Sequence, residues 1–230
     1  MNVAIIPARG GSKRILDKNI KDFCGKPIIA YSIRAAQESE LFDRIIVSTD
    51  SKKIAEVASL LGAEIPFIRP QELSDDLTHT DPVILHALEW LLEKECDVNY
   101  VCCLYPTAPF IISKYLKEGF SLLKQNNATS VFPVTTFRSS IFRALKINEN
   151  RRVEMFWPEY FNSHSQDLET AYYGAGQFYW ADVEKYLKEK SFYSNDAIPL
   201  VLPNYLVQDI DTQEDWDMAE MMFKVNKYKE

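Results

Sequence analysis

Short apolar strands alternate with amphipathic helices along much of the chain, and this alternation most narrows the folds open to it. The strand patterns are rich in branched apolar residues and occur at 2–7, 44–50, 99–105 and 129–134. Strands without a polar face are buried on both sides. Helical spacing is found at about 27–38, 51–61, 82–94, 112–126 and 182–190, and again after Thr212. The pattern predicts an α/β fold with a mostly parallel sheet flanked by helices, in which ligands bind beyond the carboxyl ends of the strands.

The alternation breaks at about residue 137, where short strand patterns and aromatic-rich turns follow one another as far as about residue 176. This stretch is too long for a simple connection, and its aromatic content argues against disorder. The length of 230 residues fits a single domain over 1–230 with an inserted β-rich arm at 137–176. Such an arm buries its surface either against a second chain or against its own domain.

Composition and charge limit the possible partners. The net charge of −7 does not suggest a large basic face, so nucleic acid is not an expected partner. No apolar run has the length of a membrane span, and the first residues lack the features of a signal peptide. The 4 cysteines have no zinc or redox spacing. Reduced thiols in a cytoplasmic protein are therefore expected.

The stretch IIPARGGSKRI, residues 5–15, must turn sharply at the end of the first predicted strand. Gly10 and Gly11 permit unusual dihedral angles and a close approach of the backbone to a ligand. Consecutive N–H groups in such a turn form a nest for phosphate oxygens. Arg9 and Lys13 add positive charge, and Ser12 adds a hydroxyl. The stretch matches neither the P-loop nor the dinucleotide fingerprint. It indicates a phosphate cradle, with an ordinary Gly-Gly turn and solvated charges as the alternative.

A second candidate site is the sequence DIDT near the end of the chain. Asp209 and Asp211 are two residues apart in a segment expected to be extended, so their carboxylates point the same way. Paired carboxylates facing a phosphate site suit Mg²⁺, which prefers oxygen ligands and bridges to substrate phosphates. The alternative is that Asp211 only caps the last helix and that Asp209 is solvated.

Two other stretches are ambiguous by local chemistry alone. The sequence YPTAP at 105–109 either shapes a base pocket or is only a rigid turn after a strand. Arg69 lies before a proline on a loop, where a lone arginine is usually solvated. No Ser/His/Asp arrangement suggests a hydrolase.

Together these motifs resemble a known family. The stretches IIPARGGSKRILDKNI, GKPIIAYSI and QDIDTQEDWDMAE are similar to the terminal signatures of the CMP-sialic acid synthetase family of cytidylyltransferases. The stretches IIVSTDSKKIAEVA, IRPQELSDD and LYPTAPF support the resemblance, which thus covers essentially the whole chain. Within the family, SQDLETAYYGAGQFYW is most similar to the pseudaminic acid branch.

The resemblance implies a Rossmann-like fold of the nucleotide-diphospho-sugar transferase type, a homodimer and an Mg²⁺-dependent reaction. CTP and a nine-carbon α-keto acid sugar, here pseudaminic acid, would give the CMP-sugar and pyrophosphate. The resemblance further implies that the CMP-sugar is used in flagellin glycosylation or in surface polysaccharide. Synthesis of CMP-N-acetylneuraminic or CMP-legionaminic acid is the neighbouring alternative. The alternative from a different functional class is a non-catalytic protein that binds a nucleotide sugar. A third and weaker alternative is that the arm is a module that docks other proteins.

The resemblance also assigns roles by position. The residues implied to bind the nucleotide are Arg9, Gly10, Gly11, Ser12, Lys13, Asn19, Arg69 and Thr80. Those implied to act in catalysis are Arg9, Lys13, Lys18, Asp209 and Asp211, of which the two aspartates hold the metal. The sugar site is implied to involve Arg143 and Gln166 of the arm, from the second subunit, and Ala175.

The chain departs from the family pattern at three places. Tyr105 stands where these synthetases usually have a glutamine, and Ala175 stands where an asparagine serves the sugar. His164 and Ser165 stand where the arm often carries an arginine pair. Because histidine is only partly charged at neutral pH, His164 would hold a sugar carboxylate less firmly than arginine.

Overall fold

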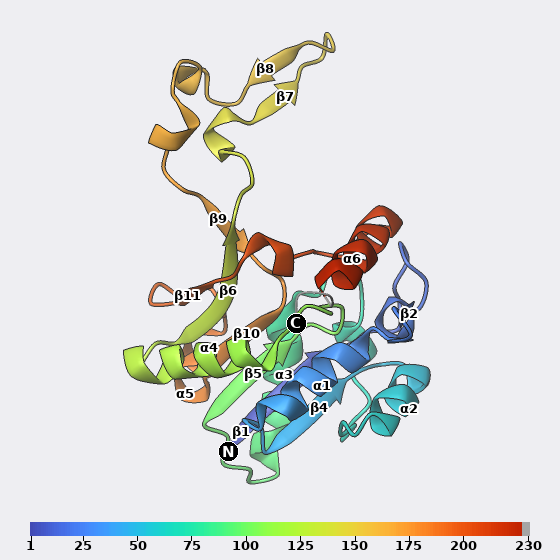
Figure 1. Ribbon diagram of the computed structural model, residues 1–230. Helices are drawn as coiled ribbons and strands as arrows, with labels where there is room; N and C mark the ends of the chain where they lie inside the picture. The colour runs from blue at the N-terminus through green and yellow to red at the C-terminus, as the bar shows by residue number, and fades with distance from the viewer. Residues whose placement is uncertain (227–230) are drawn as a thin grey trace.

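A central sheet runs through the protein, whose computed structural model describes residues 1–226 (Figure 1). The strand order is β11-β6-β10-β5-β1-β4, with β9 paired to β6. The strands of this sheet are β1 (Asn2–Pro7), β4 (Arg44–Ser48), β5 (Tyr100–Leu104), β6 (Ser130–Thr136), β9 (Tyr172–Gly174), β10 (Phe178–Asp182) and β11 (Ile198–Val201). The helices are α1 (Ile29–Ser39), α2 (Lys52–Leu60), α3 (Thr80–Glu93), α4 (Ser113–Asn126), α5 (Val183–Glu189) and α6 (Gln213–Asn226).

The predicted layering of helices on both faces of a mostly parallel sheet is confirmed. The central strand β1 pairs in parallel with both β4 and β5. Alternate β1 side chains enter different cores, since Ala4 and Ile6 pack with residues of α1, α2 and α4, whereas Val3 and Ile5 pack with residues of α3 and α5. All four are fully buried. A strand buried on both faces explains why the sequence shows a continuous apolar run there.

The strand β10, which follows directly after the predicted arm, lies inside the sheet, although the sequence pattern predicts no strand of the sheet there. It runs antiparallel between β5 and β6. Phe178 and Trp180 are fully buried, and the indole nitrogen of Trp180 donates a 3.1 Å hydrogen bond to the carbonyl oxygen of Leu116. An isolated aromatic run carries no local sign of the distant strands that it joins, so its place in the sheet could not be deduced from periodicity.

The segment between β6 and β9 projects away from the sheet (Figure 1). It contains the hairpin of β7 (Leu145–Ile147) and β8 (Val153–Met155), in which Ile147 lies directly opposite Val153. Leu145, Ile147 and Val153 are exposed. Because residues i and i+2 share a face of a strand, these three side chains form one apolar face on the hairpin.

The sequence pattern predicts the end of α2 correctly, but it does not predict the start of α1. Gly62 follows α2 with φ +87°, as expected for a glycine that ends a helix. The helix expected to begin at Pro27 begins instead at Ile29, because Pro27 pairs with Asp22 in the hairpin of β2 (Asp22–Phe23) and β3 (Lys26–Pro27). None of the helices within residues 1–226 combines the length and apolar character needed to cross a bilayer.

Candidate active site

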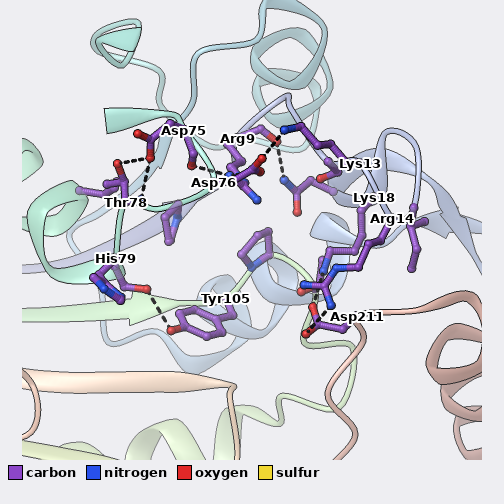
Figure 2. A pocket seen from close by; sticks show the side chains of 18 of the residues that line it. Arg9, Lys13, Arg14, Lys18, Asp75, Asp76, Thr78, His79, Tyr105 and Asp211 are labelled. Carbon is purple, nitrogen blue, oxygen red and sulfur yellow. Dashed lines mark hydrogen bonds and ion pairs between the residues drawn. The ribbon is translucent and has the colours of Figure 1, made fainter. Parts of the chain in front are cut away.

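A cleft of about 410 Å³ opens beyond the carboxyl ends of β1 and β5 (Figure 2). Residues far apart in the chain line it, from the turn after β1, the loop before α3, the turn after β5 and the segment before α6. The predicted site residues among its lining are Arg9, Ser12, Lys13, Lys18, Asn19, Arg69, Thr80, Asp209 and Asp211. The topology therefore brings together the basic cradle and the aspartate pair that the sequence treats as separate motifs.

The turn after β1 is fixed by its contact with the start of α2. The backbone N–H of Gly10 donates a 2.8 Å hydrogen bond to a carboxylate oxygen of Asp50. A β-carbon on Gly10 would lie 2.9 Å from the Cβ of Ser51, which caps α2, whereas one on Gly11 would meet nothing within 4 Å. Neither glycine lines the cleft or has a left-handed φ. Gly10 is thus needed for close packing rather than for an unusual dihedral angle.

The expected nest of free backbone N–H groups is only partly present. The N–H of Gly10 is taken by Asp50, and the N–H of Ser12 donates to the carbonyl oxygen of Gly10 over 3.0 Å. Side chains therefore supply most of the positive character of the cradle. Arg9 Nη1 lies 2.8 Å from a carboxylate oxygen of Asp76, and Lys13 donates to the other oxygen of the same carboxylate (Figure 2).

Lys18 and Asn19 connect the cradle to its surroundings. The amide nitrogen of Asn19, a buried residue, donates a 2.8 Å hydrogen bond to the carbonyl oxygen of Arg9. Lys18 Nζ donates a 2.6 Å hydrogen bond to the carbonyl oxygen of Ile210 and lies 3.4 Å from a carboxylate oxygen of Asp211. Asn19 thus positions Arg9, and Lys18 places a positive charge between the cradle and the aspartate pair.

The two aspartates face the cleft, as the sequence predicts. Asp209 is exposed to the cleft, and partial desolvation by the surrounding wall and the negative charge of Asp211 raise its pKa, against the opposing effect of Lys18. Asp211 does not cap the last helix, because Thr212 does so: the N–H of Asp215 donates a 3.2 Å hydrogen bond to Thr212 Oγ1. The capping role for Asp211 is therefore wrong, whereas Asp209 is exposed, as the same alternative supposes.

The pair fits a divalent cation that takes part of its coordination from elsewhere. Within residues 1–226, no group of three or more His, Cys, Asp or Glu side chains could hold a metal ion. Mg²⁺ commonly uses one or two carboxylates and completes its shell with water and substrate phosphates. Desolvation and the charge of Asp211 raise the pKa of Asp209, and a cation at the pair would favour its ionised form.

Arg69 is buried in the wall of the cleft, in contrast to the solvated arginine that local chemistry suggests. Only 4% of its surface is exposed. Its Nε donates a 3.1 Å hydrogen bond to Ser74 Oγ, and its Nη2 lies 3.7 Å from a carboxylate oxygen of Asp50. The buried Nη2 has no hydrogen-bond partner among the described residues. Burial lowers the pKa of this guanidinium, which remains a donor aligned with the cleft.

The turn after β5 also forms part of the wall. Tyr105, Pro106 and Thr107 line the cleft, so YPTAP is more than a strand-end turn. The hydroxyl groups of Tyr105 and Thr80 are 3.0 Å apart. Burial raises the pKa of Tyr105 to about 12, so its hydroxyl is neutral and can both donate and accept.

Sequence reasoning missed several residues of the cleft. Arg14 lines it and lies 3.3 Å from a carboxylate oxygen of Asp211. Asp75, Asp76, Thr78 and His79, from the loop before α3, line it as well. The acidic pair in LSDD was the available signal, because adjacent aspartates on a loop need cations or hydrogen-bond donors as partners when they are not simply solvated.

Three predicted sugar-site residues lie outside this cleft. Arg143 and Gln166 belong to the projecting arm, as does the exposed His164. Ala175 is buried and its N–H donates a 2.9 Å hydrogen bond to the carbonyl oxygen of Pro133, so it packs in the core beside β6. Within one chain, the cleft therefore contains the aspartate pair and the predicted nucleotide-binding residues other than Gly10 and Gly11, but none of the described arm residues.

A mostly parallel sheet with a cleft at its carboxyl edge is the arrangement in which α/β proteins bind their ligands. Residues 3–224 match the family model described as cytidylyltransferase. The chain therefore belongs to the cytidylyltransferase family and is an enzyme of that class, which confirms the family predicted from the motifs.

Two curated relatives are similar over almost their whole length. A pseudaminic acid cytidylyltransferase of Campylobacter jejuni is 44% identical over 225 residues, which cover 98% of this chain and 97% of the relative. A CMP-N,N'-diacetyllegionaminic acid synthase of Legionella pneumophila is 33% identical, with 98% and 97% covered.

Solved structures confirm the predicted fold. A CMP:2-keto-3-deoxy-manno-octonic acid synthetase, solved in complex with CTP, superposes with a TM-score of 0.68 at 13% identity over 98% of this chain and 99% of the other. The 4-diphosphocytidyl-2C-methyl-D-erythritol synthase of Anaerococcus prevotii gives a TM-score of 0.63 at 16% identity, with 97% and 98% covered.

Proposed function

We propose that the protein transfers CMP from CTP to pseudaminic acid, a nine-carbon α-keto acid sugar, and releases pyrophosphate. The observation that carries the proposal is the meeting of the cradle cations Arg9 and Lys13 with the Asp209–Asp211 pair in one cleft. The name of the Campylobacter jejuni relative supports pseudaminic acid as the sugar. The Legionella pneumophila relative keeps legionaminic acid as the second candidate.

The cationic side chains of the cleft suit a triphosphate. Arg9 can hold two oxygens at once, and Lys13 is a mobile point charge that follows them. As the sugar hydroxyl attacks the α-phosphorus, negative charge grows on the phosphate oxygens and on the leaving pyrophosphate. Cations gathered around these oxygens lower the barrier because they stabilise this growing charge. Lys18, held by Ile210 and Asp211, is positioned for the reacting phosphate.

Asp209 and Asp211 would hold Mg²⁺, which when bound neutralises charge on the triphosphate and orients it. The place of both carboxylates in the lining of the same cleft as the cradle supports this assignment. The cytosine base of CTP would lie near Arg69 and Thr80, deep in the cleft. The buried Nη2 of Arg69, which lacks a hydrogen-bond partner among residues 1–226, suits a carbonyl acceptor on the base.

The arm would complete the site in a homodimer. Its hairpin presents the apolar face of Leu145, Ile147 and Val153, which is too exposed to be explained by packing within its own chain. We place Arg143 and Gln166 at the sugar of a second subunit, because within one chain they lie outside the cleft. The buried thiols Cys102 and Cys103 are compatible with a reducing cytoplasm.

Pyrophosphate release from CTP and Mg²⁺ tests the proposal, with pseudaminic, legionaminic and N-acetylneuraminic acids offered in parallel. Activity with pseudaminic acid alone supports the proposal as stated, and activity with another sugar transfers it to that sugar. Asp209→Ala should abolish turnover, and Asp217→Asn, which removes an exposed carboxylate of α6 outside the cleft, should not. Binding of CTP without turnover of any sugar would instead favour a non-catalytic nucleotide-sugar-binding protein.

A further inference from the structure

We infer that Asp76 is an internal competitor for the phosphate groups, which pairs with the two cradle cations and promotes the departure of pyrophosphate. The inference rests on the proposed function of Arg9 and Lys13 as phosphate-binding residues. It assigns Asp76 a positioning role that acts through these cations, without contact with the reacting atoms.

The geometry of Asp76 resembles that of a phosphate on the cradle. One carboxylate oxygen lies 2.8 Å from Arg9 Nη1, and the other accepts a hydrogen bond from Lys13 Nζ (Figure 2). A single anion thus spans both cations. Lys13 and Arg9 lower the pKa of Asp76, so the carboxylate is fully ionised at neutral pH and competes as an anion. Phosphate oxygens that bind these cations must displace it.

The loop holds Asp76 in this position through contacts of its own. The carboxylate of the neighbouring Asp75 accepts hydrogen bonds from the N–H of Leu77 over 2.9 Å and from the N–H and hydroxyl of Thr78, each over 2.7 Å. Arg9 also donates to the carbonyl oxygen of Asp75. Ser74 Oγ donates a 3.0 Å hydrogen bond to the carbonyl oxygen of Pro70. A carboxylate on a loop so fixed returns to the same place after each displacement, unlike a freely mobile surface ion pair.

The charge balance allows the exchange in both directions. Arg9 and Lys13 together carry two positive charges against the single negative charge of Asp76, so a more highly charged triphosphate displaces it. Exposed ion pairs contribute little individually, which makes the competition mild. After transfer, pyrophosphate is held by the same cations, and the return of Asp76 raises its rate of departure. Because CTP and pyrophosphate need the same two cations, Asp76 should weaken the binding of both ligands by the same factor.

Calorimetric titration with inorganic pyrophosphate, CTP and cytidine separates this role from a structural one. Asp76→Asn should lower the dissociation constants of pyrophosphate and CTP by about threefold to tenfold, as expected when the screened ion pairs that compete with these ligands are lost. Cytidine, which has no phosphate, should bind unchanged. In turnover, the inhibition constant of pyrophosphate and the KM for CTP should fall together.

The matched control is Glu72→Gln, which removes the same charge from the same loop at an exposed position outside the cleft. It should change pyrophosphate affinity less than twofold. Tightening by Glu72→Gln as large as that by Asp76→Asn would overturn the inference, because long-range charge would then explain it.

A second variant, Lys13→Ala, separates failure of the inference from failure of the proposed function. Weaker pyrophosphate binding in Lys13→Ala, with unchanged or weaker binding in Asp76→Asn, would leave the cradle in place and refute the role of Asp76. Unchanged binding in both variants would refute the phosphate cradle itself.

Discussion

Lys18 Nζ lies 3.4 Å from a carboxylate oxygen of Asp211, although 193 positions separate the two residues in the sequence. Arg14 lies 3.3 Å from the other carboxylate oxygen. The turn that follows β1 and the segment that precedes α6 are therefore tied together by charge. The same contacts that align the aspartate pair with the cradle also join the two ends of the described chain.

Lys18→Met tests the catalytic part of this contact. We expect turnover to fall by about a hundredfold or more, because a fixed cation near the reacting phosphate is lost. The free energy of unfolding should change by less than about 1 kcal/mol, since the ion pair is partly exposed. Pyrophosphate release and urea denaturation measure the two effects. Lys21→Met is the control, because Lys21 hydrogen-bonds Gln213 and lies over Trp216 outside the cleft. Near wild-type turnover of Lys18→Met would contradict the assignment.

Gly10→Ala and Gly11→Ala form a matched pair at the cradle. The new β-carbon on Gly10 would lie 2.9 Å from the Cβ of Ser51 and force the turn away from α2. We expect a loss of about 1–3 kcal/mol, typical of overpacking, with weaker CTP binding. Gly11→Ala places its β-carbon in open space and should change stability by less than about 0.5 kcal/mol. Equal urea midpoints for the two variants would show that close contact with Ser51 is not the reason why position 10 needs a glycine.

The fold and much of the cleft follow from local sequence patterns. Buried strands such as β1 are visible as continuous apolar runs, and their carboxyl ends must share one edge of a parallel sheet. That rule alone places Arg9 and Tyr105 on the same edge. Local chemistry indicated the motifs at Arg9–Lys13 and Asp209–Asp211 as candidates but left an alternative open for each, until the fold brought both segments into one cleft.

Other parts depend on contacts between distant segments and were not predictable. Nothing local shows that Trp180 lies in the middle of the sheet or that Arg69 is buried. The N–H of Gly10 was expected to face phosphate, yet Asp50 takes it, because the end of the neighbouring strand β4 approaches the turn. Local chemistry predicted a solvated Arg69, and only the family resemblance predicted that Arg69 belongs to the binding site.

Asp196→Asn should make stability depend less on pH. The carboxylate of Asp196 accepts hydrogen bonds from Ser194, over 2.8 Å, and from the N–H and hydroxyl of Thr129, over 2.9 and 3.1 Å. The Ser194 and Thr129 contacts lower its pKa below the ordinary value of 3.8. A lowered pKa stabilises the fold above the ordinary pKa, and this contribution is lost as the pH falls through the lowered value.

At pH 7 the variant should therefore lose about 1 kcal/mol, the contribution of one hydrogen bond at a screened site. Below the lowered pKa the difference from wild type should disappear. Urea denaturation at both pH values measures it, with Glu118→Gln, an exposed carboxylate of α4, as the control for net charge. A loss that is equal at both pH values would mean that shape, rather than ionisation, is responsible.

Ile147→Glu tests whether the hairpin face of the arm joins two copies of the chain. Ile147 and Val153 are paired across β7 and β8 and both are exposed. A charge in the centre of an apolar contact must be desolvated without a partner, so we expect the dimer to dissociate at least tenfold more readily. Light scattering should show the molar mass fall toward that of one chain, and turnover should fall with it because Arg143 and Gln166 would no longer reach a second cleft. Leu60→Glu, at an exposed leucine of α2, should leave both unchanged. A wild-type protein that is already monomeric would instead make the arm a docking surface for a different protein.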